Sequence, residues 1–320
     1  RLKLNTEQRR QLAKKTDDES LQQRLLADQD PLVSRALAAN KALCKVVQQQ
    51  IAKDAIVTVR CHLIYNENLH PEVQEQLAHD PSYELRESLA RRDELSEAVQ
   101  LVLARDEDQD VLEALASRTG AAALPVPVQL ELVKSNPDVR KALAHNDNLG
   151  APAQLLLARD SNMEVRRILA AHPNLISAAL QFLAMDVIEV QTSLAGNRHL
   201  GSALLQMGLS QHKSECVRSA LAGNSALNFE VQAHLLKDKN PKVREALSGN
   251  CNLADNILET LSSDEHYDVR ANLVRRRDSV SPSVQRHLAK DPDIDIRKCL
   301  ARAADLLDGV QQQLAGDLPE

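Results

Sequence analysis

One eight-residue pattern returns eleven times along this chain, at intervals of about 26 residues. It reads VRKALAHN at 139–146, and when each copy is numbered from its first apolar residue, the copies begin at 33, 59, 85, 111, 139, 165, 190, 217, 243, 269 and 296. The residue four positions later is leucine in every copy, from Leu37 to Leu300. A fixed period of this length is typical of a repeat architecture. The fold is therefore expected to be a stack of one small unit.

Each copy predicts two short helices. The first apolar residue, position 0, and the leucine four residues later lie on one helical face. A second pair with the same spacing follows, as in Val73 with Leu77, and Leu69 fills the turn between the two pairs. One such unit cannot bury its apolar face alone, whereas stacked neighbours can. We therefore expect an all-α fold, a right-handed α-solenoid of about eleven two-helix repeats of ~26 residues.

Two polar columns mark the expected helix ends. Asparagine follows the first helix in six copies, where it often takes the left-handed position that glycine favours: Asn40, Asn66, Asn146, Asn197, Asn224 and Asn250. Aspartate, a preferred N-terminal cap, stands four or five residues before position 0 in nine copies: Asp28, Asp54, Asp80, Asp106, Asp160, Asp186, Asp238, Asp264 and Asp291.

The repeats occupy residues 28–317 of the chain. Residues 1–27 are expected to form N-terminal capping helices, with 7–18 resembling the second helix of a repeat, and 318–320 form a tail. One interval is two residues longer than the usual 26, and it falls at 117–136, which contains Gly120, Pro125 and Pro127. Because proline restricts the residue before it to extended backbone, this segment predicts either a longer turn or a hinge that alters the curvature.

Aromatic residues are scarce: the chain has three tyrosines, two phenylalanines and no tryptophan. A core of near-identical slices accepts only residues that fit every slice, here leucine, valine and alanine. Tyr65, Phe182 and Phe229 stand beside core columns and are expected to pack there. Tyr83 and Tyr267 share one position, two residues before position 0, and are candidate surface contacts.

The repeat phrase D-P-x-x-V-R-x-x-L-A-x-N, followed by N-L-x-x-x-V-x-x-x-L-A-x-D, resembles the leucine-rich repeat variant family. Residues 238–264 and 291–317 carry it well, and the likeness extends over nearly all of 28–317, although broader HEAT-like solenoids look similar. The resemblance implies a superhelical scaffold of two-helix repeats, one helix often 3₁₀, and it names no activity. One member type binds an iron–sulfur cluster through clustered cysteines; here five cysteines are widely spaced, so no cofactor is implied.

Arginine follows position 0 in eight copies. The stripe could bind phosphate or an acidic peptide, but each arginine can instead bond an aspartate of its own or the next repeat, which would neutralise it. We favour this structural ladder for Arg60, Arg86, Arg140, Arg166, Arg218, Arg244, Arg270 and Arg297.

Other arginines break the pattern and are candidates for partner binding. Arg92, Arg118 and Arg276 replace the helix-end asparagine, and further arginines stand beside this position. Such residues form either a solvated edge or an edge that binds an acidic partner. The candidate partner-binding set is Arg91, Arg92, Arg118, Arg275, Arg276, Arg277, Arg302, Tyr83 and Tyr267.

No catalytic, cofactor-binding or metal-binding motif is evident. The chain lacks Cys-x-x-Cys pairs and metal-binding histidine spacings, and its nine glycines form no phosphate-binding loop. No apolar run is long enough for a membrane span, no signal peptide is visible, and the scattered cysteines suit a reducing, cytoplasmic setting.

The sequence favours a non-enzymatic scaffold that binds a protein or peptide along an extended solenoid surface. The alternative is a nucleic-acid-binding helical-repeat protein, comparable to solenoid DNA glycosylases. A net charge of −6 and the scarcity of aromatics make nucleic acid the weaker alternative.

Overall fold

A computed structural model describes residues 4–28, 30–118, 124–276, 281–302 and 306–315. Throughout these ranges the regular secondary structure is helical, and the chain divides into two compact units, Arg1–Leu157 and Ala158–Glu320. The two units are described separately below. The expected all-α solenoid is confirmed, because each unit consists of helix pairs stacked on one another.

The helices alternate between two sets. The odd-numbered helices begin near each position 0, and they are α1 (Thr6–Lys15), α3 (Pro31–Ala38), α5 (Val57–Ile64), α7 (Tyr83–Ala90), α9 (Gln109–Ala116), α11 (Pro137–Ala144), α13 (Met163–Ala170), α15 (Ile188–Ala195), α17 (Glu215–Ala222), α19 (Pro241–Ser248), α21 (Tyr267–Arg275) and α23 (Ile294–Leu300). The even-numbered helices carry the second apolar pair, and they are α2 (Glu19–Leu26), α4 (Lys45–Ile51), α6 (Pro71–Leu77), α8 (Glu97–Leu103), α10 (Val126–Leu132), α12 (Ala151–Leu157), α14 (Ser177–Ala184), α16 (Ala203–Ser210), α18 (Phe229–Leu235), α20 (Asp255–Leu261), α22 (Pro282–Leu288) and α24 (Asp308–Leu314).

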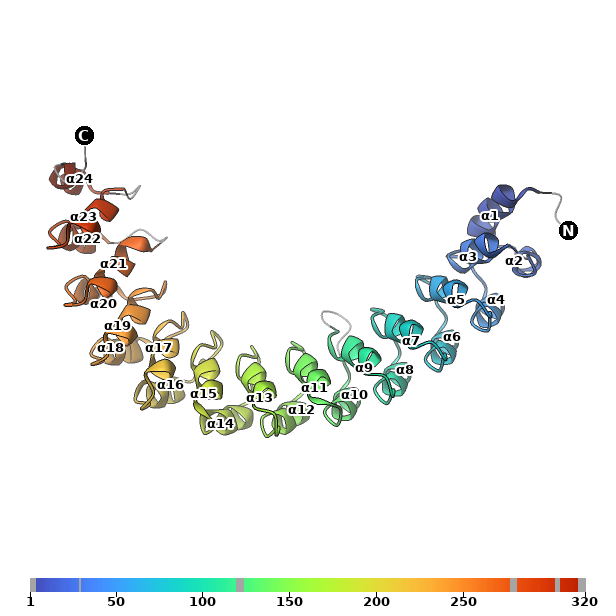
Figure 1. Ribbon diagram of the computed structural model, residues 1–320, viewed down its shortest axis with the longest axis horizontal. Helices are drawn as coiled ribbons and strands as arrows, with labels where there is room; N and C mark the ends of the chain where they lie inside the picture. The colour runs from blue at the N-terminus through green and yellow to red at the C-terminus, as the bar shows by residue number, and fades with distance from the viewer. Residues whose placement is uncertain (1–3, 29, 119–123, 277–280, 303–305, 316–320) are drawn as a thin grey trace. The chain divides into compact units, whose positions relative to one another are not determined.

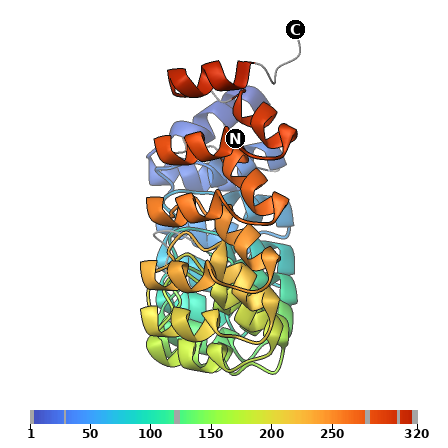
Figure 2. The ribbon, with the colours of Figure 1, turned by 90° about the vertical axis from the view of Figure 1, so that its left-hand side faces the viewer.

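Within each unit the two sets form two layers (Figure 1). Odd-numbered helices pack on odd-numbered neighbours and form an odd layer, while the even-numbered helices form an even layer behind it. Figure 2 shows successive helix pairs of the C-terminal unit stacked above one another. Neighbouring helices pack more extensively in the odd layer than in the even layer, so each unit curves with its odd layer on the inner side.

The N-terminal segment differs from the expectation. Residues 7–18 were expected to match a second helix, but α1 packs against α3 and so belongs to the odd layer. Arg9 also donates to Asp28 through Nε at 2.6 Å, which copies the arginine column of the later repeats. Helices α1 and α2 therefore form a complete two-helix unit at the start of the stack.

Aliphatic columns form the core of each unit. The residues at position 0 and four residues later are at most 1% exposed in all eleven copies. The expectation that Tyr65, Phe182 and Phe229 pack in the core is wrong, because they are 73%, 38% and 52% exposed. All five aromatic residues lie on the surface, and one is covered by a cation: the Arg159 guanidinium lies 3.9 Å from the centre of the Phe182 ring.

The aspartate column does not cap the helices directly. Asp54 Oδ1 accepts the backbone N–H of Ile56 at 2.8 Å, and Ile56 is the residue that precedes α5 as its N-cap. The same turn joins Asp238 to Asn240, the N-cap of α19. The carboxylate thus stands two residues before the cap, where its other oxygen can reach a neighbouring repeat.

Buried asparagines join consecutive repeats, a role beyond the expected helix end. Asn66 Nδ2 donates to the carbonyls of Ala38 and Asn40 in the preceding repeat, at 2.9 and 2.8 Å, and its Oδ1 accepts the N–H of Asn68. Helix ends present free carbonyls that need such partners. Equivalent cross-repeat bonds are made by Asn40, Asn146, Asn197, Asn224 and Asn250.

A second buried amide column was not recognised from the sequence. Gln48 Nε2 donates to the carbonyls of Leu43 and Asn68, and its Oε1 accepts the N–H of His70 in the next repeat at 2.9 Å. Buried glutamines hold the same place in the even-numbered helices, directly after the first residue of the second apolar pair, as Gln48 follows Val47 and Gln74 follows Val73. The column comprises Gln22, Gln48, Gln74, Gln100, Gln129, Gln154, Gln206, Gln232 and Gln285.

The irregular segment at 117–136 is only partly described, since residues 119–123 lie outside the described ranges. Leu124 is 3% exposed, and α10 begins directly after Pro125. Helix α10 packs on both α8 and α12, while α9 packs on α11. Stacking therefore continues across the longer interval in both layers.

Candidate functional site

The arginine column pairs with the aspartate column of the next repeat. Arg60 Nε and Nη2 donate to the two carboxylate oxygens of Asp80 at 2.7 and 2.9 Å, and Arg60 Nη1 donates to the backbone carbonyl of Asp54 in its own repeat. The same two-pronged pairing joins Arg86 to Asp106, Arg166 to Asp186, Arg218 to Asp238, Arg244 to Asp264 and Arg270 to Asp291.

Two further predicted ladder arginines show the bond to their own repeat. Arg140 Nη1 donates to the carbonyl of Ser135 at 2.5 Å, and Arg297 Nη1 donates to the carbonyl of Asp291 at 2.7 Å. The bidentate arginine–aspartate pairs of the other six ladder arginines are strong, and they fix the direction of the interaction as well as its distance. The stripe is therefore structural where the pairing is seen, and it leaves these guanidinium groups few free donors for a ligand.

The pairing changes the acidity of the aspartates. Burial alone would raise the pKa of Asp106, but the bond from Arg86, the backbone N–H of Asp108 and the positive charge of Arg86 together hold that pKa below the usual aspartate range. Asp186, Asp238 and Asp264 have lowered pKa values for the same reasons, with Arg166, Arg218 and Arg244 as their partners. Each charged carboxylate is therefore favoured in the folded state.

We expect stability to fall in acid and to change little near neutrality. Because the folded pKa values lie below the ordinary value of about 3.9, the ladder contribution is complete above that range and is lost as pH falls through the lowered values. Urea unfolding followed by circular dichroism between pH 7 and pH 3 should show the decline only below about pH 5. A decline centred between pH 6 and pH 7 would assign the pH dependence to histidines instead.

Three predicted partner-binding arginines have internal roles. Arg118 is 6% exposed, and its Nη1 and Nη2 donate to the carbonyls of Ala90, Arg92 and Asp93. Arg276 donates to the carbonyls of Asn250 and Cys251.

Arg92 likewise donates to the carbonyl of Ile64. These arginines stand in the asparagine column and supply the same donors to the preceding repeat. Arg92, Arg118 and Arg276 therefore bind the protein's own backbone, a role that the sequence did not predict.

Arg91 and Tyr83 are two further predicted contacts, and both are exposed on the odd layer. Arg91 is exposed and donates to Glu87, whereas Arg277 lies outside the described residues. Tyr83 is 40% exposed, and its pKa is raised by the negative charge of Glu84, with Asp110 adding to the effect. The surroundings of Tyr83 are therefore acidic and do not suit an acidic partner.

The remaining three candidates meet in one pocket between α21 and α23. Tyr267 and Arg275 line it from α21, and Lys298 and Arg302 line it from α23 and the residues that follow. Tyr267, Ala271 and Arg275 follow one another at intervals of four residues, so they lie on one face of α21. We call this cavity of about 230 Å³ the odd-layer pocket.

The odd-layer pocket has an apolar floor and a basic rim. Ala271 and Ile296 are buried beneath it, while Arg275 and Arg302 are exposed. Asp295 is the single carboxylate in the lining. Across the described ranges, no ion pair engages Arg275, Lys298 or Arg302.

The pocket lies in a basic stretch of an acidic chain. Residues 270–302 hold nine lysines and arginines against four aspartates, a net charge of +5, whereas the whole chain carries −6. Three of the lining residues, Tyr267, Arg275 and Arg302, were predicted from the sequence as partner contacts, whereas Lys298 was not. The sequence could have indicated Lys298, because Lys298 and Arg302 are four residues apart in the last copy of the repeat pattern.

All five cysteines are free, and no cluster of metal-binding side chains is found among the described residues. No described helix is both long and apolar enough to cross a membrane.

Comparisons with known proteins found no matching family model and no similar curated protein. A solved structure entitled "A leucine-rich repeat variant with a novel repetitive protein structural motif" is 20% identical, with 83% of this chain and 88% of that chain covered and a TM-score of 0.44. A computationally designed armadillo repeat protein for modular peptide recognition is 16% identical, over 84% of this chain and 96% of the design, with a TM-score of 0.13. A designed armadillo repeat protein in complex with the peptide (KR)4 is 15% identical, over 83% and 95%, also at 0.13.

Proposed function

We propose that this protein is a non-enzymatic scaffold that holds an acidic segment of a protein partner in the odd-layer pocket. The observation that carries the proposal is the meeting of Arg275, Lys298 and Arg302 around Tyr267 without internal ion pairs among the described residues. Six of the ladder arginines are paired with aspartates of the next repeat, whereas no such ion pair engages the basic residues on the rim of this pocket within the described ranges.

The geometry suits a carboxylate-bearing peptide. Arginine offers a planar set of donors that matches a carboxylate, and lysine offers a mobile point charge. Tyr267 adds an aromatic face and a hydroxyl, a combination that is enriched where proteins bind one another. The floor of Ala271 and Ile296 gives room for the aliphatic stem of a glutamate.

Charge reversal at the rim tests the proposal. A fluorescein-labelled octaglutamate peptide should bind the wild-type protein in a fluorescence anisotropy titration, and the Arg275→Glu/Arg302→Glu double variant should bind it about tenfold more weakly or worse, because attraction at two contacts becomes repulsion. Binding should also weaken with added salt.

A matched double variant tests whether binding depends on the pocket itself or only on the net charge of the protein. Lys213 and Lys237 are exposed residues of the same unit outside the pocket, so Lys213→Glu/Lys237→Glu changes the net charge equally. It should keep close to wild-type affinity. Equal losses in both double variants would mean that the peptide senses only the overall charge and would overturn the proposal.

Nucleic acid is the second candidate for the same pocket. Tyr267 beside three cations resembles, on a small scale, the stacking and phosphate contacts of single-stranded nucleic-acid sites. A labelled 20-nucleotide single-stranded DNA in the same titration decides between the candidates. Binding of the DNA that is tighter than that of octaglutamate and sensitive to Tyr267→Ala would favour the nucleic acid.

A further inference from the structure

A larger cavity lies on the even layer of the C-terminal unit, between α22 and α24. It measures about 470 Å³, within the range of ligand pockets in proteins, and we call it the even-layer pocket. Its lining comprises two basic residues, one carboxylate and four further residues: Arg286, Lys290, Asp308, Leu307, Gly309, Val310 and Gln313. None of these residues belongs to the odd-layer pocket or to the arginine–aspartate ladder.

The walls of the even-layer pocket are held in place by the repeat frame. The backbone N–H of Leu307 donates to Oε1 of Gln285, the buried glutamine of the preceding repeat, at 3.0 Å. Gln313 Nε2 donates to the carbonyl of Ala289 at 3.0 Å. These bonds connect both ends of α24 to α22 and to the residue that follows α22.

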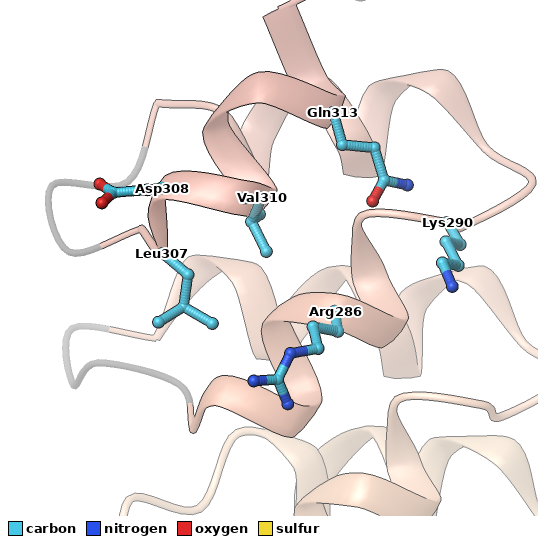
Figure 3. Close-up of a pocket in the computed structure, with 7 residues that line it drawn as sticks. Arg286, Lys290, Leu307, Asp308, Val310 and Gln313 are labelled. Atoms are coloured by element: carbon cyan, nitrogen blue, oxygen red, sulfur yellow. The ribbon is translucent and has the colours of Figure 1, made fainter.

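Apolar and basic side chains face the same space. In Figure 3 the side chains of Leu307 and Val310 and the guanidinium of Arg286 lie around the cavity, whereas the carboxylate of Asp308 points away from it. Val310 is 2% exposed and Leu307 is half-buried, so they form an apolar wall. Arg286 and Lys290 are exposed and four residues apart, which places both on one face of α22 and its C-terminal end.

The positive charge of the even-layer pocket is not cancelled internally. No ion pair within the described ranges engages Arg286 or Lys290, and both fall in the stretch of net charge +5. An occupant that complements these walls has an apolar group for Leu307 and Val310 and an anionic group for Arg286.

We propose that the even-layer pocket binds a peptide segment in which a leucine-sized apolar side chain stands next to a carboxylate side chain. The apolar side chain fills the space against Leu307 and Val310, and the carboxylate pairs with Arg286. This second site does not require the odd-layer pocket to bind anything, so the two proposals can fail separately.

Gly309 offers a direct way to close the pocket. A Cβ placed on Gly309 meets no atom within 4 Å, so the first carbon of a side chain can be added there without a clash. Gly309→Phe should occupy the cavity and lower the affinity at least tenfold, while Gly309→Ala, which adds one methyl group, should keep most of it. Unchanged thermal unfolding midpoints would show that both variants are folded.

Three labelled hexapeptides separate the two parts of the recognition. The first is Glu-Glu-Leu-Glu-Glu-Leu, the second replaces both leucines by serine, and the third replaces all glutamates by glutamine. The titrations use the Arg275→Glu/Arg302→Glu variant, whose odd-layer pocket is disabled. This variant should bind the first peptide and should bind each of the other two at least tenfold more weakly. Adding Arg286→Glu to the variant should abolish binding of the first peptide. Asp308→Asn should have little effect, because that side chain points away.

The outcomes are distinct. Equal binding of the leucine and serine peptides, or full binding to Gly309→Phe, would overturn the proposal of an apolar-and-acidic site. Failure of octaglutamate to bind the wild-type protein, together with Gly309-dependent binding of the leucine peptide, would overturn the proposed function of the odd-layer pocket and leave the even-layer pocket standing.

Discussion

Replacing Asp80 by alanine is expected to destabilise the N-terminal unit by about 3–5 kcal/mol, the usual cost of removing one member of a buried ion pair. Asp80 and Arg60 are each 6% exposed, and both carboxylate oxygens of Asp80 accept bonds from Arg60. Without Asp80, a buried guanidinium keeps its charge and loses its partner. The backbone N–H of Ser82, which donates to Asp80 Oδ1, also loses its acceptor.

Hydrogen exchange of the backbone amides in α5 and α7 is the most informative measurement, because a repeat array can open locally. Protection should fall most there and less at α1. The double variant Arg60→Met/Asp80→Leu is the control, since replacing a whole buried pair by apolar residues costs much less than breaking it. If the double variant were as unstable as Asp80→Ala, packing rather than the unpaired charge would be the cause.

The second large effect is expected at the asparagine column. Asn224→Ala should cost about 3 kcal/mol or more, because several buried polar groups lose their partner at once and each such loss typically costs 1–3 kcal/mol. Asn224 is 2% exposed and donates to the carbonyls of Ala195 and Asn197, while its Oδ1 accepts the N–H of Ala226. Urea unfolding of the Asn224→Ala variant measures the loss.

An arginine at the same position should recover much of this stability. Arg118 and Arg276 occupy the asparagine column elsewhere and donate to the equivalent carbonyls. Asn224→Arg should therefore be clearly more stable than Asn224→Ala, although it does not restore an acceptor for Ala226. A ranking with arginine below alanine would contradict the role assigned to Arg118 and Arg276.

The repeat frame made the fold predictable, because position 0 and its leucine carry the burial that stacks the helices. The same frame predicted the arginine–aspartate ladder, since both columns recur together. Whether an arginine binds its own or the next repeat could not be read from spacing. Arg60 does both, through the backbone of Asp54 and the carboxylate of Asp80, because a guanidinium has donors on two sides.

The polar amide columns show where sequence reasoning was insufficient. Asparagine after a helix is common for local reasons, so nothing in one repeat indicated that Asn66 reaches back to Ala38. Arg118 then looked like a break in the pattern, although it performs the same task. Gln48 was overlooked because glutamine on a short helix usually faces solvent, and only its recurrence at one position in repeat after repeat could have marked it as buried.

The placement of every aromatic ring on the surface decides what light absorption and emission can report. With no tryptophan and with Tyr65, Tyr83 and Tyr267 at 73%, 40% and 38% exposure, the tyrosine signals arise outside the aliphatic core. Near-ultraviolet spectra should therefore change little when the core melts, and far-ultraviolet measurements are needed to follow unfolding. Because Tyr267 is exposed and lines the odd-layer pocket, its absorption and fluorescence should change when a ligand enters that pocket.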